Sequence, residues 1–212
     1  MAGTIKIDDF DALLVIDIQN DFCPGGALEI PDGDRVVEPA NRMIDAFSTV
    51  VLSQDWHPGG HKSFASSHSG RQPMDLVTMP YGDQVLWPDH CVQGSSGADF
   101  HAGLNTHKAD LIVRKGCKSH IDSYSAFFEN DRTTTTGLGG FLKQRGIRRI
   151  FLTGLAAEYC VGFSALDGVQ EGFEAFVFED AVQALGGEHF ETMHRTQRDA
   201  GIRFITTGDV VF

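Results

Sequence analysis

RIFLTGLAAEYCVGFSALDG, residues 149–168, joins three kinds of local structure without a break. Its first five residues form a short apolar run, which predicts a buried strand. A turn of small residues follows, and a helix is expected to begin near Cys160 and to end at about Glu171, before Gly172. A strand, a tight turn and a helix in direct succession are typical of an α/β protein.

The same alternation continues on both sides of this stretch. Further short apolar runs predict strands at 12–16, 49–52, 111–113, 175–178 and 203–205. Helices are expected at 35–47, 137–145 and 189–200. This alternation favours parallel strands joined by right-handed crossovers. The expected fold class is therefore α/β, a three-layer sandwich with a central, mostly parallel sheet and helices on both faces.

One long segment does not follow the alternation. Residues 56–109 show neither helical nor strand periodicity, and a segment of this kind inside a compact domain is usually functional. The length of 212 residues suits one domain with a substantial core. We therefore expect a single domain over residues 1–212, with a metal-binding irregular insertion at about 56–109.

Charge and composition exclude several classes of protein. With 17 Lys and Arg against 29 Asp and Glu, the net charge is −12, which argues against nucleic-acid and membrane partners. The N-terminus lacks the basic region of a signal peptide, and no apolar run reaches the roughly 18 residues of a membrane span. The four cysteines are widely scattered, so we expect free thiols in the cytoplasm. A homo-oligomer is compatible with the sequence.

Four reactive side chains follow predicted strands. Asp17, Asp55 and Lys115 come at or just after the ends of three strands, and Cys160 follows a fourth. The carboxyl ends of parallel strands meet at one edge of a sheet, where α/β proteins bind their ligands. Two carboxylates, an amine and a thiol are therefore expected to lie together.

The position of Cys160 favours a nucleophile. A thiol at a helix N-terminus has its pKa lowered from about 8.5 towards neutrality, and free N–H groups there can stabilise an oxyanion. Asp17 could take the thiol proton, and Lys115 could hold the pair in its ionised form. The alternatives are a buried structural cysteine, a turn-capping carboxylate and a surface lysine. The other cysteines lack this context and are interpreted as structural; they are Cys23, Cys91 and Cys117.

QDWHPGGHKSF, residues 54–64, places Asp55, His57 and His61 in a loop whose Pro and Gly residues exclude a regular helix. His90 ends the same insertion, in WPDHC. Carboxylate oxygen and imidazole nitrogen suit a divalent transition metal, which leaves zinc, manganese and iron open. Asp55, His57 and His90 predict a three-ligand site with open positions. His61 is either a fourth ligand or a water-bridged neighbour.

Five motifs make the chain resemble the nicotinamidase/pyrazinamidase family of isochorismatase-like cysteine hydrolases. They are VIDIQNDFCPGGAL (15–28), SQDWHPGGHKSFAS (53–66), LWPDHCVQGSSGADFH (86–101), VRKGCKSHIDSYSAF (113–127) and TGLAAEYCVGFSALDG (153–168). The resemblance extends over almost the whole chain. The Asp–Lys–Cys order marks the superfamily, and the metal-ligand segments separate this family from metal-free isochorismatases and carbamoyl-sarcosine amidases.

The resemblance implies that Cys160 attacks the carboxamide carbon of nicotinamide. Asp17 would take the thiol proton and pass it to the departing ammonia, with Lys115 orienting Asp17. Water would then hydrolyse the thioester to nicotinate, a step of NAD salvage, and pyrazinamide would give pyrazinoate in the same way. The backbone N–H groups of Ala156 and Cys160 would form the oxyanion hole, beside a cis peptide between Leu155 and Ala156.

The resemblance also implies one divalent metal, with zinc favoured over manganese and iron, against the pyridine nitrogen. The substrate-binding positions that it implies are Phe22, Trp87, Tyr124 and Leu155. Glu158 stands where the family often has aspartate, so no role is carried over to it.

Two alternatives remain at this point. One is another hydrolase of the superfamily that acts on a different amide or on isochorismate. The other is a catalytically inactive module that senses a metal or a thiol. The presence of Asp17, Lys115 and Cys160 together favours an enzyme.

Overall fold

A computed structural model describes residues 4–212, and a six-stranded sheet forms its centre. The strand order is β6-β3-β2-β7-β8-β9, and every neighbouring pair is parallel. The strands are β2 (Asp11–Ile16), β3 (Thr49–Asp55), β6 (Leu111–Lys115), β7 (Arg149–Leu155), β8 (Glu174–Gln183) and β9 (Arg203–Ile205). All six strands expected from the sequence are confirmed.

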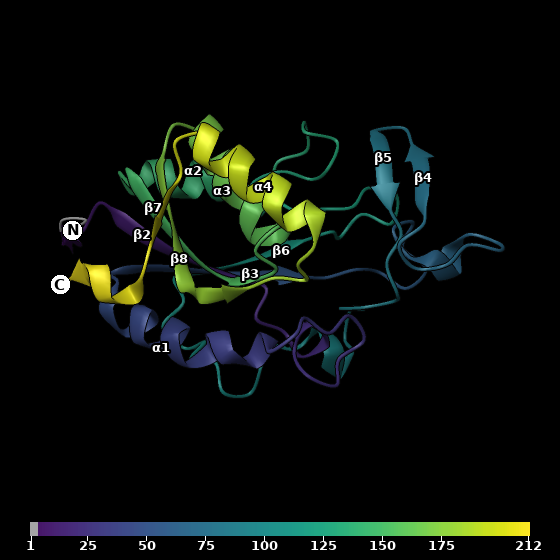
Figure 1. Cartoon of the computed structure of the whole chain (residues 1–212), viewed down its shortest axis with the longest axis horizontal. Helices are drawn as coiled ribbons and strands as arrows, with labels where there is room; N and C mark the ends of the chain where they lie inside the picture. Colours follow the sequence, from purple (N-terminus) through teal and green to yellow (C-terminus); the bar gives the residue numbers. More distant parts are fainter. Residues whose placement is uncertain (1–3) are drawn as a thin grey trace.

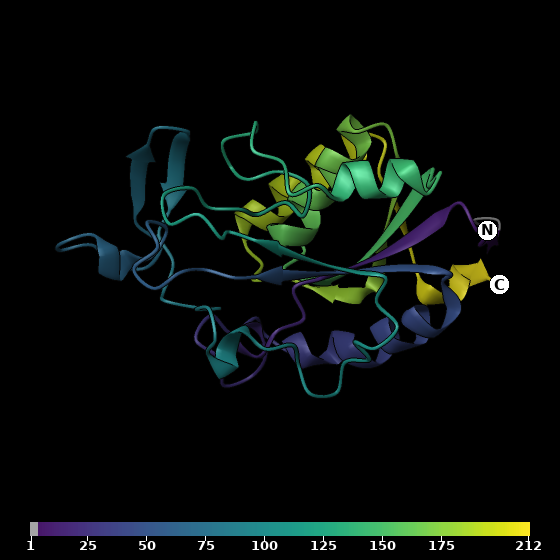
Figure 2. The same cartoon turned by 180° about the vertical axis from the view of Figure 1, so that it is seen from behind.

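Helices cover both faces of this sheet. The helix α1 (Val37–Ala46) lies on one face, and α2 (Leu138–Gln144), α3 (Cys160–Gln170) and α4 (Glu188–Asp199) lie on the other (Figures 1 and 2). The α/β three-layer sandwich is therefore confirmed. Short 3-10 helices occupy several loops; they are η1 (Asn20–Phe22), η2 (Gly33–Val36), η3 (Ala65–Ser67), η4 (Ser96–Ala98) and η5 (Thr207–Asp209).

The core consists of two apolar layers, one on each side of the sheet. Side chains of the central strand β2 pack alternately in the two layers, because successive side chains of a strand point to opposite faces. Leu13 packs in the layer that contains Ile44 of α1, and Leu14 packs in the layer that contains Val161 of α3. Burial of both faces explains why β2 reads as an uninterrupted apolar run.

Glycine is required where β7 passes closest to β2. Gly154 has φ of +121°, and a Cβ placed on it would lie 2.0 Å from the carbonyl oxygen of Ile16. No side chain fits at that distance, so this position holds the strand that leads to Cys160 tightly against the strand that leads to Asp17.

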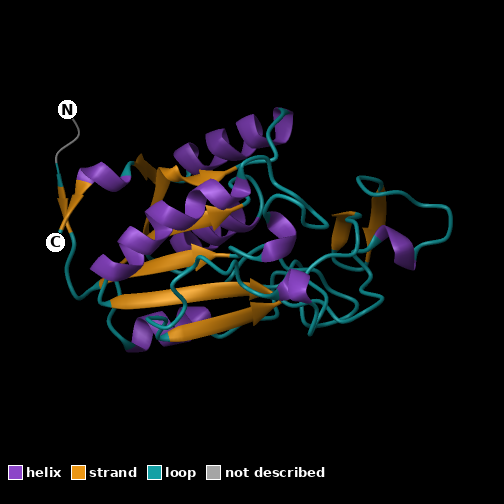
Figure 3. Cartoon of the chain, turned by 90° about the horizontal axis from the view of Figure 1, so that it is seen from below, coloured by secondary structure: helices purple, strands orange, loops and turns teal. Residues whose placement is uncertain are grey.

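The insertion at 56–109 is more regular than the sequence predicts. It contains an antiparallel hairpin of β4 (Leu76–Met79) and β5 (Gly82–Val85) as well as η3 and η4. The hairpin lies beyond the carboxyl ends of the central strands (Figure 3). Only one of its strand residues is buried, so it lacks the alternation of apolar and polar residues that predicts a half-buried strand.

The two chain ends pair with each other. β1 (Ile5–Lys6) and β10 (Val210–Val211) form a short parallel ladder at the end of the molecule opposite the hairpin (Figure 1). Within residues 4–212, no helix combines the length and the apolar character that crossing a membrane requires.

Candidate active site

The four reactive side chains expected at the sheet edge do meet there. Asp17 follows β2, Asp55 ends β3, Lys115 ends β6, and Cys160 begins α3 after the turn that follows β7. The ammonium nitrogen of Lys115 lies 2.9 Å from Asp17 Oδ2, 2.9 Å from Asp55 Oδ1 and 3.4 Å from Cys160 Sγ. All four side chains are buried. The topology therefore assembles one cluster from four strand ends.

Lys115 is a fully buried cation with matched partners. Its Nζ also donates a hydrogen bond to the carbonyl oxygen of Ser123 at 2.9 Å. Burial by itself lowers the pKa of a lysine, but the carboxylates of Asp17 and Asp55 raise the pKa of Lys115 well above its ordinary value. The ammonium group therefore stays charged at neutral pH.

Asp17 is held in an unusual conformation with one oxygen left free. Its backbone is left-handed, with φ of 47°, which is uncommon for a residue other than glycine. The hydroxyl of Ser53 donates to Asp17 Oδ1 at 2.7 Å and accepts the Asp17 N–H at 3.2 Å. Oδ2 lies within 2.9 Å of Lys115 Nζ but outside hydrogen-bond alignment, and no other donor in residues 4–212 reaches it. This oxygen is free to accept a proton.

Burial sets the protonation of the cluster. It raises the pKa of Asp17 despite the opposing charge of Lys115. It also raises the pKa of the Cys160 thiol well above its ordinary value, with Asp17 and Asp55 adding to the effect. The expected lowering of the Cys160 pKa by the helix N-terminus is therefore wrong, because desolvation and two carboxylates outweigh Lys115. The resting state is a thiol beside a proton acceptor.

Two backbone N–H groups beside the thiol lack partners. The peptide between Leu155 and Ala156 is cis, as expected. Among the described residues, the N–H groups of Ala156 and Cys160 donate to no protein acceptor, whereas those of Ala157 and Val161 bind backbone carbonyls. Two free donors next to Sγ can stabilise an oxyanion.

The donors of Asp55, His57 and His90 converge. Asp55 Oδ2 lies 3.1 Å from His57 Nε2 and 3.4 Å from His90 Nε2. The Nδ1 atoms face backbone carbonyls, that of His57 towards Gly116 at 3.0 Å and that of His90 towards Pro88 at 2.8 Å. With its proton on Nδ1, each ring presents an Nε2 lone pair towards the Asp55 carboxylate. Two nitrogen lone pairs and a carboxylate oxygen form a donor set for a cation. The residues therefore fit a divalent metal ion.

His61 lies beside Asp55, His57 and His90 but belongs to a second group of possible metal donors. Its Nδ1 accepts the N–H of Ser63 at 3.1 Å, and its Nε2 lies 2.8 Å from the carbonyl oxygen of Lys118, to which it donates. Both ring nitrogens thus have protein partners. The atoms that could share a metal with His61 belong to His57 and Asp122.

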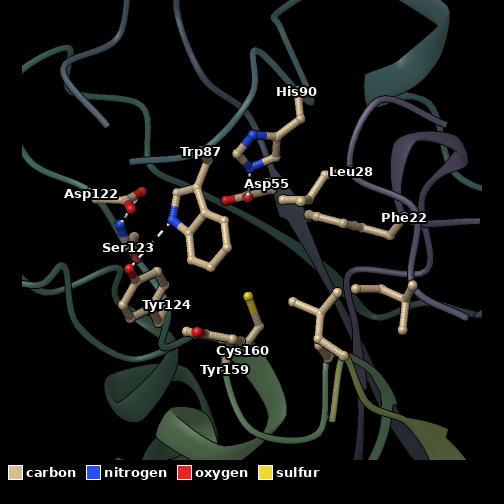
Figure 4. A pocket seen from close by; sticks show the side chains of 13 residues that line it. Phe22, Leu28, Asp55, Trp87, His90, Asp122, Ser123, Tyr124, Tyr159 and Cys160 are labelled. Atoms are coloured by element: carbon tan, nitrogen blue, oxygen red, sulfur yellow. Dashed lines mark hydrogen bonds and ion pairs between the residues drawn. The ribbon is translucent and has the colours of Figure 1, made fainter. Parts of the chain in front are cut away.

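A pocket separates the thiol from the Asp55–His90 pair. Figure 4 shows the sulfur of Cys160 pointing into it, with Asp55 and His90 across the space and Phe22 and Trp87 on opposite sides. The full lining consists of Phe22, Leu28, Ile30, Asp55, Trp87, His90, Asp122, Ser123, Tyr124, Ala156, Tyr159, Cys160 and Leu185. The pocket is thus bounded by aromatic walls, with reactive groups at its two ends.

The structure does not bring every expected substrate residue to this pocket. Phe22, Trp87 and Tyr124 line it, but the side chain of Leu155 packs in the apolar layer on the α1 side of the sheet. Leu155 is the last residue of β7, and only the following residue, Ala156, reaches the pocket wall.

Several site residues were missed by the sequence reasoning. Ser53, which binds Asp17, carried a usable signal, because it stands two residues before Asp55 on β3 and so faces the same side of the sheet. Asp122 and Leu185 follow no predicted strand, and no spacing pattern would have found them.

Comparison with known proteins gives a consistent result. The pattern of the isochorismatase domain matches residues 11–209. A nicotinamidase of Acinetobacter baylyi is 48% identical over 174 residues, which cover 82% of this chain and 81% of the relative. A solved nicotinamidase/pyrazinamidase structure from Acinetobacter baumanii has a TM-score of 0.94 at 46% identity and covers 95% of this chain and 98% of its own. The pyrazinamidase of Pyrococcus horikoshii, solved in complex with zinc, has a TM-score of 0.76 at 34% identity, with coverages of 92% and 98%.

Proposed function

The chain belongs to the isochorismatase domain family, and from its site we propose that it hydrolyses nicotinamide to nicotinate and ammonia. Pyrazinamide is converted to pyrazinoate in the same way. The observation that carries this function is the position of Lys115 Nζ within 3.4 Å of Asp17, Asp55 and Cys160 at one end of a ring-sized pocket. The converging donors of His57 and Asp55 at the other end favour a ring amide over the substrate of a metal-free relative.

We assign Asp55, His57 and His90 as ligands of one divalent metal. Zinc is favoured, since the related pyrazinamidase binds it, and the oxygen and nitrogen donors also permit manganese or iron. Bound there, the metal supplies an electron-pair acceptor for the pyridine nitrogen. His61 supports His57 from the side, through a ring contact with centroids 4.5 Å apart.

The first half-reaction begins with proton transfer from Cys160 Sγ to Asp17 Oδ2, the carboxylate oxygen without an aligned donor. The sulfur forms a bond with the carboxamide carbon, and the electron pair moves onto the oxygen. The N–H groups of Ala156 and Cys160 stabilise that oxyanion. Asp17 then protonates the nitrogen, the C–N bond breaks, and ammonia leaves a thioester on Cys160. Lys115 stays charged throughout and balances the carboxylates.

In the second half-reaction, water is the nucleophile and the sulfur of Cys160 is the leaving group, with Asp17 again transferring the proton. Asp17 takes a proton from water, the resulting hydroxide adds to the thioester carbon, and the C–S bond breaks. The proton on Asp17 returns to the sulfur of Cys160. Nicotinate leaves, and the cluster regains its resting protonation.

The pocket walls suit a flat ring. Phe22 and Trp87 lie on opposite sides of the space in front of the sulfur (Figure 4), and Leu28 and Leu185 add apolar surface. Such walls accept an aromatic ring.

We also propose that residues 1–212 form a single domain that includes the metal-binding insertion, which is supported by the domain match over residues 11–209. A cytoplasmic location is supported by the four cysteines, all of which are unpaired thiols.

Ammonia release from nicotinamide, measured with and without a chelator, tests the function. Cys160→Ala is expected to lower kcat by roughly 10⁴-fold or more while keeping one metal ion per chain. Cys117→Ala is the matched control, because this thiol is exposed, and its turnover should equal that of the wild type. A Cys160→Ala protein with wild-type turnover would refute the assignment of the nucleophile.

A further inference from the structure

The hairpin β4–β5 carries one buried polar side chain. Gln84 is 1% exposed, whereas Leu76 on the paired strand is 61% exposed, and no other residue of the two strands is buried. Burying an amide is costly unless its polar atoms are hydrogen-bonded. The partners of Gln84 should therefore reveal its role.

Five hydrogen bonds surround the Gln84 amide. The two N–H groups of its Nε2 face three acceptors, so one N–H is shared between two of them: Asp122 Oδ2 at 2.8 Å, Tyr124 Oη at 3.1 Å and the carbonyl oxygen of Val85 at 2.7 Å. Its Oε1 accepts from Tyr81 Oη at 3.1 Å and from Asn130 Nδ2 at 3.3 Å. The amide thus connects the hairpin to one loop, residues 122–130, which supplies Asp122 and Tyr124 to the pocket.

Two of these partners lie directly on the pocket. Asp122 Oδ1 is 4.0 Å from His57 Nε2, on the metal side. Tyr124 Oη accepts the indole N–H of Trp87 at 3.3 Å, which holds the aromatic wall opposite Phe22 (Figure 4). One side chain therefore links the neighbour of a metal ligand to the wall that would face the substrate ring.

We propose that Gln84 is a positioning residue that sets the pocket width for a single flat ring. It does so by tying Tyr124, and through it Trp87, to Asp122 at a constant distance. The inference rests on the proposed hydrolysis of nicotinamide. Gln84 forms no hydrogen bond with Lys115, Asp17 or Cys160, so it acts on ring binding and ring size rather than on the chemical steps.

Kinetics of Gln84→Leu test the proposal, with Asp83→Asn as the matched control on the exposed neighbouring position. We expect the KM for nicotinamide to rise about tenfold, which corresponds to the loss of one or two hydrogen bonds, with kcat within about twofold of the wild type. The preference for nicotinamide over a two-ring amide, quinoline-3-carboxamide, should fall by a similar factor. Asp83→Asn should leave all three quantities unchanged.

A double-mutant cycle separates positioning from a purely structural role. Gln84→Glu places a carboxylate against Asp122, and adding Asp122→Asn restores a donor and an acceptor with the direction of the bond reversed. KM should rise in Gln84→Glu, where two carboxylates face each other, and should change less in Asp122→Asn, whose amide oxygen still accepts from Gln84. In the double variant KM should recover towards the wild-type value. The cycle also covers the case in which Gln84→Leu fails to fold.

The results distinguish this inference from the proposed function. If the wild type releases no ammonia from nicotinamide, the function itself fails. If the wild type is active but folded Gln84 variants keep its KM and ring preference, or if they lose only thermal stability, the positioning role of Gln84 is wrong.

Discussion

Replacing Ser53 by alanine removes the hydroxyl that donates to Asp17 Oδ1 at 2.7 Å. Both side chains are buried, so water does not replace the lost bond easily. A hydrogen bond to a charged group contributes about 1.5–3 kcal/mol. At about 1.4 kcal/mol per unit of pKa, its loss should raise the pKa of Asp17 by roughly one to two units.

The sign of the effect on activity follows from the role of Asp17. The pKa of Asp17 is already raised by burial, and the Ser53 hydroxyl opposes that rise. Asp17 must be ionised to take the thiol proton, so activity is lost on acidification as the pH falls through this pKa. In Ser53→Ala, the acid limb of kcat/KM should therefore move to higher pH by roughly one to two units. The alkaline limb should stay in place, because burial and the nearby carboxylates keep the pKa of Cys160 high in both proteins.

The assay is ammonia release as a function of pH at low nicotinamide concentration. Ser164→Ala is the matched control, because it deletes another buried hydroxyl, one that accepts the Ala126 N–H at 2.8 Å and does not touch Asp17. This control loses a buried hydrogen bond and should be less stable, yet its acid limb should coincide with that of the wild type. An unshifted acid limb in folded Ser53→Ala would refute Asp17 as the proton acceptor.

Two further substitutions test the metal cluster and the strand packing. His57→Ala removes one of three converging donors, so bound metal should fall below one ion per chain. The KM for nicotinamide should rise roughly tenfold or more. Unchanged metal content on elemental analysis would contradict the assignment of His57 as a ligand. Gly154→Ala places a Cβ 2.0 Å from the carbonyl oxygen of Ile16 at φ of +121°, so the free energy of unfolding should fall by about 3 kcal/mol or more. Equal urea midpoints for Gly154→Ala and the wild type would contradict the prediction and show that β7 and β2 can move apart at this position at little cost in free energy.

The sequence predicts the sheet and the meeting of its strand ends because both depend on simple patterns. Each central strand is buried on two faces and therefore appears as an apolar run, as in β2. Asp17, Asp55 and Lys115 stand at or next to strand ends, so the parallel topology is enough to bring them together.

The remaining parts of the site depend on contacts that no local pattern encodes. The raised pKa of Cys160 follows from burial among carboxylates that lie more than a hundred residues away in the chain. Gln84 lies on a mostly exposed hairpin, and its partners Asp122 and Tyr124 come from a loop without strand or helix signals. Leu155 points away from the pocket and into the apolar layer on the α1 side, which depends on how β7 packs in the core.

Lys115 is carried by β6, a strand at the border of the sheet that, within residues 4–212, pairs with β3 alone. Border strands have half the ladder bonds of interior strands and open first in local unfolding. Local opening of β6 would withdraw the ammonium group from Asp17 while the interior pairing of β2 with β7 remains intact. Recovery of turnover during refolding therefore requires β6 to have docked on β3, because that strand delivers the cation.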